Sequence, residues 1–222
     1  MNSKYQSFIF DRDGTIVATR EDIADSVNLS LEHHHLPTHP LNERMTFIGN
    51  GSVKLIQRAL GEGHLDQYES VFDEYYRIYA KHYKDKTHPF PGIIESLEYA
   101  KSSGILLFIY TNKPQNIALD VRKTYFGDLF TKMVGIPLGG VVKPDPKAFL
   151  EQTKPYHLDF AKAAYFGDSV TDLQTAFNLH IENRYSVLWG YQSKEKLLSY
   201  PIQPKAFLAS PLQIKDVVDG KI

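Results

Sequence analysis

The chain of 222 residues has a formal net charge of -1, with 42% hydrophobic and 23% charged residues, so it resembles ordinary globular proteins and has no general electrostatic reason to bind nucleic acid or a membrane surface. It contains no cysteine, which excludes disulfides and thiolate metal sites. The amino-terminal segment lacks the apolar core of a signal peptide and no apolar run approaches the ~18 residues of a membrane span, so we expect a cytoplasmic protein.

The first expected element is a short buried strand, "SFIF" at residues 7–10, which runs directly into Asp11 and Asp13. Two carboxylates one residue apart repel each other, and burying either of them costs free energy unless something compensates. A cation or a catalytic role is the usual reason for such an arrangement. The stretch that follows the strand is therefore the first candidate for a functional site.

A block of helices follows the first strand. The first helix is expected from about Thr19, which has the spacing of a capping box with Asp22, and its apolar residues recur on one face at Ile23, Val27 and Leu31. A glycine-flanked turn then precedes a second helix ending near residue 60, and a third is expected over 65–83. No good strand is found between residues 20 and 83.

The second half of the chain alternates between strands and helices. Strands are expected at 105–110, 133–138, 163–166 and 185–189, and helices at 93–103, 114–125, 145–153 and 169–179. Gly104 is expected just beyond the end of the first of these helices, and Pro114 in the first turn of the second. Such alternation favours an α/β fold with a parallel sheet and helices on both of its faces.

The helical block interrupts this α/β pattern after the first strand. We expect a catalytic core made of residues 1–17 and 86–222, and an inserted helical domain over 18–85. An insertion that starts beside a candidate site is well placed to act as a lid.

Polar residues gather where the carboxyl ends of the strands are expected. Sites in open α/β sheets form at that edge. The residues in question follow or flank four separate apolar runs: Asp11 and Asp13, Thr111 and Asn112, Lys143, and Asp168 with Asp172.

Each of these side chains has a physical task in phosphoryl transfer. Asp11 can attack phosphorus as a nucleophile, and Asp13 can give a proton to the leaving oxygen and then take one from water. Thr111 can donate to phosphate oxygens. Lys143 can offset negative charge in the transition state. A hard divalent cation with oxygen ligands would neutralise the carboxylates and the phosphate, and Asp168 and Asp172 would complete its site.

Four motifs, "DRDGT", "TNK", "KPDP" and "GDSVTD", stand in the order and approximate spacing of those of the haloacid dehalogenase superfamily, which the chain resembles over nearly its whole length. The resemblance implies a Rossmann-like, doubly wound parallel sheet with an inserted helical cap. It also implies Mg²⁺, bound by Asp11, Asp168 and the backbone carbonyl of Asp13, with Asp172 assisting through water.

Within the superfamily the chain resembles phosphoglycolate phosphatases. The segment "FIGNGSVKLIQRAL" is similar to their cap segment, so Gly49, Asn50 and Gly51 are expected to contact substrate. Arg12 stands where that group usually has an apolar residue, and "TAFNLH" lacks the usual glycine ending. The implied function is magnesium-dependent hydrolysis of a small phosphorylated metabolite, with 2-phosphoglycolate first, by a monomer or homodimer with no nucleic-acid or membrane partner.

Other functions use the same residues. A phosphomutase resembling β-phosphoglucomutase would share every core residue named. A dehalogenase is disfavoured because Asp13 would have no task in halide displacement. A non-enzymatic phospho-acceptor of the receiver type is disfavoured by Asp13 and by the insertion after the first strand. The motifs also have ordinary structural readings: "GDSVTD" is a good start for a helix, with Asp168 or Ser169 as the cap.

Overall fold

In the computed structural model, which describes residues 4–48, 51–136 and 140–222, the chain divides into two units. One unit contains Met1–Val17 and Pro89–Ile222, and the other contains Ala18–His88. No helix among the described residues is both long and apolar enough to cross a bilayer.

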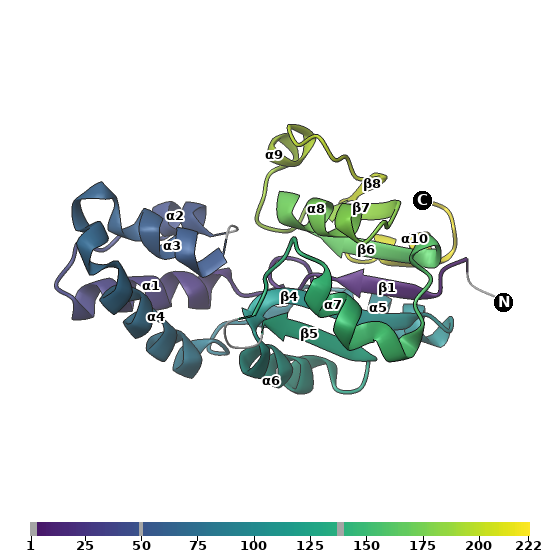
Figure 1. The fold of residues 1–222 in the computed structure, drawn as a ribbon, viewed down its shortest axis with the longest axis horizontal. Coiled ribbons are helices and arrows are strands. Elements are labelled where there is room, and N and C mark those ends of the chain that lie inside the picture. The colour runs from purple at the N-terminus through teal and green to yellow at the C-terminus, as the bar shows by residue number, and fades with distance from the viewer. Residues whose placement is uncertain (1–3, 49–50, 137–139) are drawn as a thin grey trace. The chain divides into compact units, whose positions relative to one another are not determined.

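Six parallel strands form the sheet of the larger unit (Figure 1). In spatial order they are β5 (Lys132–Ile136), β4 (Leu106–Pro114), β1 (Ser7–Phe10), β6 (Ala163–Gly167), β7 (Asn183–Val187) and β8 (Ala206–Leu208). All four residues of β1 are buried, as expected of a central strand covered on both faces. The predicted α/β class with a doubly wound parallel sheet is confirmed.

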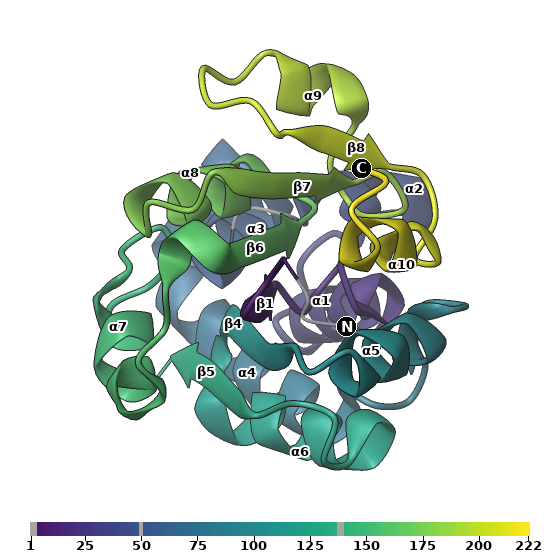
Figure 2. The same cartoon turned by 90° about the vertical axis from the view of Figure 1, so that its right-hand side faces the viewer.

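Helices cover both faces of this sheet (Figure 2). The helices of this unit are α5 (Ile93–Ser102), α6 (Gln115–Phe126), α7 (Lys147–Thr153), α8 (Val170–Asn178), α9 (Lys194–Leu198) and α10 (Gln213–Val218), with short 3-10 turns η3 (Lys154–Tyr156) and η4 (Phe160–Lys162). Helices α7 and α8 lie on one face of the sheet, and α5 packs against α10 on the other.

Strand alternation divides the core between the two faces. Ile9 and Tyr165 belong to the cluster beneath α7 and α8. On the opposite face the Phe10 and Phe166 rings stack with centroids 4.7 Å apart, and the ring of Tyr185 stacks on that of Phe166 at 5.2 Å. Since burying one large apolar side chain contributes roughly 1.5–3 kcal/mol, these rings hold β1, β6 and β7 firmly together.

The expected boundaries hold for most of these elements, with two corrections. β4 was expected to end at residue 110, but it continues to Pro114, which pairs with Ile136 of β5. Pro114 therefore precedes α6 in an extended conformation and does not lie in its first turn. Gly104 follows the end of α5 with φ of +82°, as predicted. Strand β8 and helices α9 and α10 were not predicted.

The smaller unit consists of α1 (Arg20–His33), α2 (Leu41–Arg44), α3 (Gly51–Leu60) and α4 (Tyr68–His82), with 3-10 turns η1 (Met45–Phe47) and η2 (Glu62–Gln67). The apolar residues expected on one face of α1 are buried, and α1 packs along α4. Two short strands, β2 (Val17–Ala18) and β3 (His88–Pro89), form a separate two-stranded sheet.

The capping box predicted for α1 is wrong. Thr19 precedes the helix, but its side chain makes no capping hydrogen bond. Asp22 is buried and accepts hydrogen bonds from the backbone N–H groups of Lys86 and Thr87, at 2.9 Å and 2.8 Å. These bonds attach residues 86–87 to α1 within the unit Ala18–His88.

Candidate functional site

Strand register brings the ends of β1 and β6 level with the second half of β4. Phe10 at the end of β1 pairs with Ile109 of β4 and with Phe166 of β6. Asp11 therefore follows β1 at the level where Thr111 lies on β4 and where β6 leads into Asp168. The common edge predicted from the sequence is the one found, at the carboxyl ends of the central strands.

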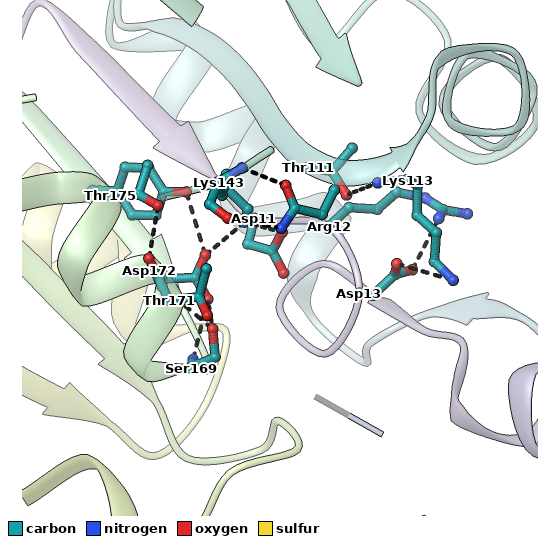
Figure 3. Close-up of polar contacts among 12 residues, drawn as sticks. Asp11, Arg12, Asp13, Thr111, Lys113, Lys143, Ser169, Thr171, Asp172 and Thr175 are labelled. Carbon is teal, nitrogen blue, oxygen red and sulfur yellow. Dashed lines mark hydrogen bonds and ion pairs between the residues drawn. The ribbon is translucent and has the colours of Figure 1, made fainter. Parts of the chain in front are cut away.

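Lys143 reaches this edge from the loop before α7 (Figure 3). Its ammonium group donates to Oδ1 of Asp11 at 2.6 Å and to Oδ1 of Asp172 at 2.7 Å. Asn112 holds the loop in place, since its amide accepts from the Lys143 N–H at 2.6 Å and donates to the Lys143 carbonyl at 3.2 Å. The side chain of Asn112 thus helps to position Lys143.

Burial and mutual repulsion set the charges of the site. Burial raises the pKa of Asp11 to about 7, although Lys143 opposes the rise. Burial also raises the pKa of Asp168 well above its usual range, with the neighbouring carboxylates adding to the effect. Burial alone would lower the pKa of Lys143, but Asp11 and Asp172 reverse this and keep its pKa well above the ordinary value. The ammonium group is therefore charged, and it faces more carboxylate than it can neutralise.

Asp172 serves both the site and the start of α8. Ser169 precedes α8 and forms a capping box with Asp172: the Asp172 N–H lies 3.3 Å from the serine Oγ, and Asp172 Oδ2 accepts from the Ser169 N–H at 3.1 Å. Oδ2 also accepts from the Ser169 hydroxyl at 2.6 Å, while Oδ1 accepts from Lys143 and from the Tyr165 hydroxyl. The ordinary reading of "GDSVTD" as a helix start is correct and does not exclude the functional one.

Asp13 lies apart from this cluster, between two cations. Arg12, only 1% exposed, donates through Nη1 to Oδ1 of Asp13 at 2.9 Å, and Nζ of Lys113 lies 3.7 Å from Oδ2 (Figure 3). Gly14 follows with φ of +85°, and a Cβ at this position would overlap Oδ2 of Asp168. A glycine is needed here both for the backbone conformation and for this close approach.

The cluster fits a divalent cation. Asp11, Asp168 and Asp172 are buried, and each offers an oxygen within 4.8 Å of those of the others. With all three carboxylates ionised, as a bound cation requires, the cluster and the Lys143 ammonium would together carry two negative charges, and carboxylate oxygens are the ligands that Mg²⁺ prefers. Since protein donors already occupy both oxygens of Asp172, Asp11 and Asp168 are the better placed direct ligands. The Asp13 carboxylate is not part of this group.

Other residues of the predicted site are placed as follows. Thr111 is buried on β4, and its hydroxyl accepts from the Lys113 N–H at 3.3 Å. Gly51 begins α3 in the helical unit, with φ of +81°. Gly49 and Asn50 lie outside the described residues.

Sequence reasoning missed two groups that contact the cluster. Tyr165, inside β6, was taken only as part of a strand, but its hydroxyl lies 3.3 Å from Oδ1 of Asp172. The backbone N–H of Tyr191 donates to Oδ2 of Asp168 at 2.6 Å. Their positions in the sequence could have indicated both contacts. Tyr165 stands three residues before Asp168 in a parallel strand, and Tyr191 follows the end of β7, at the same edge of the sheet.

Comparison with protein families gives one assignment over most of the chain. Residues 8–183 match the family described as haloacid dehalogenase-like hydrolase. A curated relative, the phosphoglycolate phosphatase of Psychrobacter arcticus, is 31% identical over 199 residues, which cover 84% of each chain.

Solved structures extend the comparison to the fold. A protein from Lactobacillus delbrueckii subsp. bulgaricus, provisionally named a phosphoglycolate phosphatase, is 25% identical with a TM-score of 0.89, covering 96% of this chain and 98% of that one. A protein from Thermotoga maritima, provisionally named a β-phosphoglucomutase, is 23% identical with a TM-score of 0.70, covering 98% of this chain and 100% of that one. This second likeness shows a shared fold only.

Proposed function

Because the chain belongs to the haloacid dehalogenase-like hydrolase family and is a phosphoric monoester hydrolase similar to phosphoglycolate phosphatases, we propose that it is a magnesium-dependent phosphatase of small phosphomonoesters, with 2-phosphoglycolate as its first candidate substrate. The observation that carries this proposal is the buried group of Asp11, Asp168 and Asp172 around the Lys143 ammonium. Such a group suits a transferring phosphoryl group and a metal ion, and it has no advantage for stability alone.

In the first step, a carboxylate oxygen of Asp11 attacks phosphorus and the bond from phosphorus to the leaving oxygen breaks. Asp13 gives its proton to that oxygen, so the alcohol leaves neutral and the phosphoryl group stays on Asp11 as an acyl phosphate. Lys143 favours the ionised form of Asp11 and stabilises the negative charge that spreads over the phosphoryl oxygens. Thr111 and nearby backbone N–H groups bind those oxygens.

In the second step, Asp13, now a carboxylate, takes a proton from water, and the hydroxide attacks phosphorus. Phosphate leaves and the Asp11 carboxylate is restored, so each group returns to its starting state. Arg12 and Lys113 lie beside Asp13 and hold its side chain in position for both proton transfers.

Asp11, Asp168 and the backbone carbonyl of Asp13 would hold the metal, with Asp172 assisting through water. When bound, Mg²⁺ supplies positive charge that neutralises the carboxylates and the phosphate. The helical unit would act as the cap: it would exclude bulk water from the reacting phosphate, and Gly49, Asn50 and Gly51 would contact the rest of the substrate.

Phosphate release from a panel of small phosphomonoesters tests this proposal. The panel contains 2-phosphoglycolate and hexose phosphates, each measured with Mg²⁺ and with chelator, for the wild type and Asp11→Asn. Magnesium-dependent release by the wild type alone is expected, with 2-phosphoglycolate as the best ester.

Two outcomes would contradict the proposal. Interconversion of hexose phosphates without net phosphate release would identify a phosphomutase that uses the same residues. A stable phosphorylated Asp11 with no turnover of any ester would identify a phospho-acceptor instead of an enzyme.

A further inference from the structure

The turn that follows β7, Leu188–Gln192 with the sequence "LWGYQ", contacts three separate parts of the site. We name it the β7 turn. The Trp189 indole N–H donates to the backbone carbonyl of Thr15 at 3.0 Å, and the Tyr191 N–H donates to Asp168 Oδ2. The side-chain oxygen of Gln192 accepts from the N–H of Val170 at 3.0 Å. One short segment thus joins the loop after β1, the residue after β6 and the start of α8.

Its contact with Asp168 is unusually close. Asp168 is 3% exposed, and the hydrogen bond from Tyr191 measures 2.6 Å. A Cβ on Gly190 would overlap the Cβ of Asp168 and would come within 2.7 Å of the Gly14 carbonyl oxygen. Only a residue without a side chain lets the turn lie against both segments, so Gly190 sets the distance between the β7 turn and Asp168.

Trp189 adds a second attachment, to the loop that carries Asp11 and Asp13. Its indole lies near the ring of Phe90, with centroids 6.5 Å apart, so the ring is supported from the side. The turn therefore fixes the loop after β1 and the loop after β6 relative to each other. The donors, Trp189 and Tyr191, lie outside the four motifs recognised in the sequence, although they bind residues of two of those motifs.

We propose that the β7 turn is a positioning element of the metal site, which sets the orientation of the Asp168 carboxylate and its separation from the Asp11–Thr15 loop. The turn takes no part in the chemistry itself. It acts by holding Asp168 where a divalent cation can bind between it and Asp11. The inference rests on the proposed magnesium site, but it concerns metal affinity and not the substrate or the reaction.

The test measures Mg²⁺ affinity by isothermal titration calorimetry on the full chain without substrate. Gly190→Ala forces the turn away from Asp168, and we expect its dissociation constant to rise at least about tenfold, the size typical of lost support around a metal ligand. Gly63→Ala is the matched control, because a Cβ at Gly63 meets nothing within 4 Å. It should bind Mg²⁺ as the wild type does.

Trp189→Phe is the second variant. It keeps an aromatic ring but removes the donor to Thr15, so it should weaken Mg²⁺ binding in the same direction by a smaller factor. The Tm of each metal-free variant is measured alongside, so that lost affinity in a folded protein can be separated from unfolding.

Unchanged Mg²⁺ affinity in a folded Gly190→Ala protein would overturn the proposal. If that variant does not fold, a folded Trp189→Phe protein with wild-type affinity would overturn it equally. Weaker metal binding in these variants, in a chain whose wild type releases phosphate from no ester, would support the positioning role while contradicting the proposed phosphatase.

Discussion

Replacing Lys143 by methionine tests the charge balance of the site. Lys143 is only 5% exposed, and its ammonium group is shared between Asp11 and Asp172. Methionine retains much of the side-chain volume but no charge. The two carboxylates would then face each other in a buried site without their common partner.

The expected cost follows from burial and from the pKa of Asp11. Removing one partner of a buried ion pair costs about 3–5 kcal/mol, because the remaining charge stays in a site with little water. Burial already raises the pKa of Asp11 to about 7, and Lys143 is the main group opposing that rise, so the variant raises it further. Protonation of Asp11 limits the cost, and we expect a loss of about 3 kcal/mol, or about 6–12 °C in Tm.

The loss should depend on pH in a definite direction. The pKa of Asp11 is about 7 in the folded protein and 3.8 as the ordinary value. The free energy of unfolding therefore falls as the pH rises between the ordinary pKa and the folded-state pKa, because the unfolded chain loses this proton first. In Lys143→Met the folded-state pKa of Asp11 is higher still, so the free energy of unfolding continues to fall at pH values above 7. We therefore expect a larger loss of stability at about pH 8 than at about pH 5.5.

Urea unfolding in the presence of chelator measures the free energy of unfolding of wild type and Lys143→Met at both pH values. The control is Lys147→Met, an exposed lysine in α7, which should change the free energy of unfolding by less than about 0.5 kcal/mol. Phosphate release with Mg²⁺ should fall at least about 10²-fold in Lys143→Met and remain normal in the control. Equal stability of the two variants at both pH values, with similar activity, would refute the reasoning.

Three further predictions concern the metal, the proton and the helical unit. Mg²⁺ affinity of the wild type should fall at least about tenfold per pH unit below about pH 7. Burial raises the pKa of Asp11 to about 7 and raises that of Asp168 as well, and bound metal requires both carboxylates. A pH-independent dissociation constant in calorimetry would contradict this. Asp13→Asn should lower kcat by about 10²–10⁴-fold while Mg²⁺ still raises Tm, and retained activity would exclude Asp13 as the proton carrier. Asp22→Ala should cost about 2–4 kcal/mol in urea unfolding, because two N–H groups lose their buried acceptor; a change no larger than that of the exposed Asp66→Ala would show that these bonds contribute little.

The sequence was sufficient for the parts of the fold that repeat a local pattern. Short apolar runs marked the inner strands, and the polar residues after them marked the edge where Asp11 and Asp168 are found together. Strand β8 was missed because three residues, Ala206–Leu208, carry too little pattern to be recognised. Their place in the sheet comes from pairing with β7.

Contacts between distant residues could not be predicted in the same way. Asp22 has the local spacing of a capping box, yet its carboxylate binds backbone groups 64 and 65 residues away. Arg12 was noted as unusual, but only the structure shows that it pairs with the adjacent Asp13. Tyr165 looks like any core aromatic, and its hydroxyl reaches Asp172 only because of where β6 ends relative to α8.

The central claim is that Asp11 carries the phosphoryl group during turnover, and chemical trapping tests it most directly. The enzyme is mixed with Mg²⁺ and its best ester, quenched in acid, and treated with borohydride, which reduces an acyl phosphate to an alcohol. Peptide mass mapping should then find homoserine at position 11, only in samples that contained substrate. Steady phosphate release with an unmodified Asp11, or with full activity in Asp11→Asn, would contradict the account.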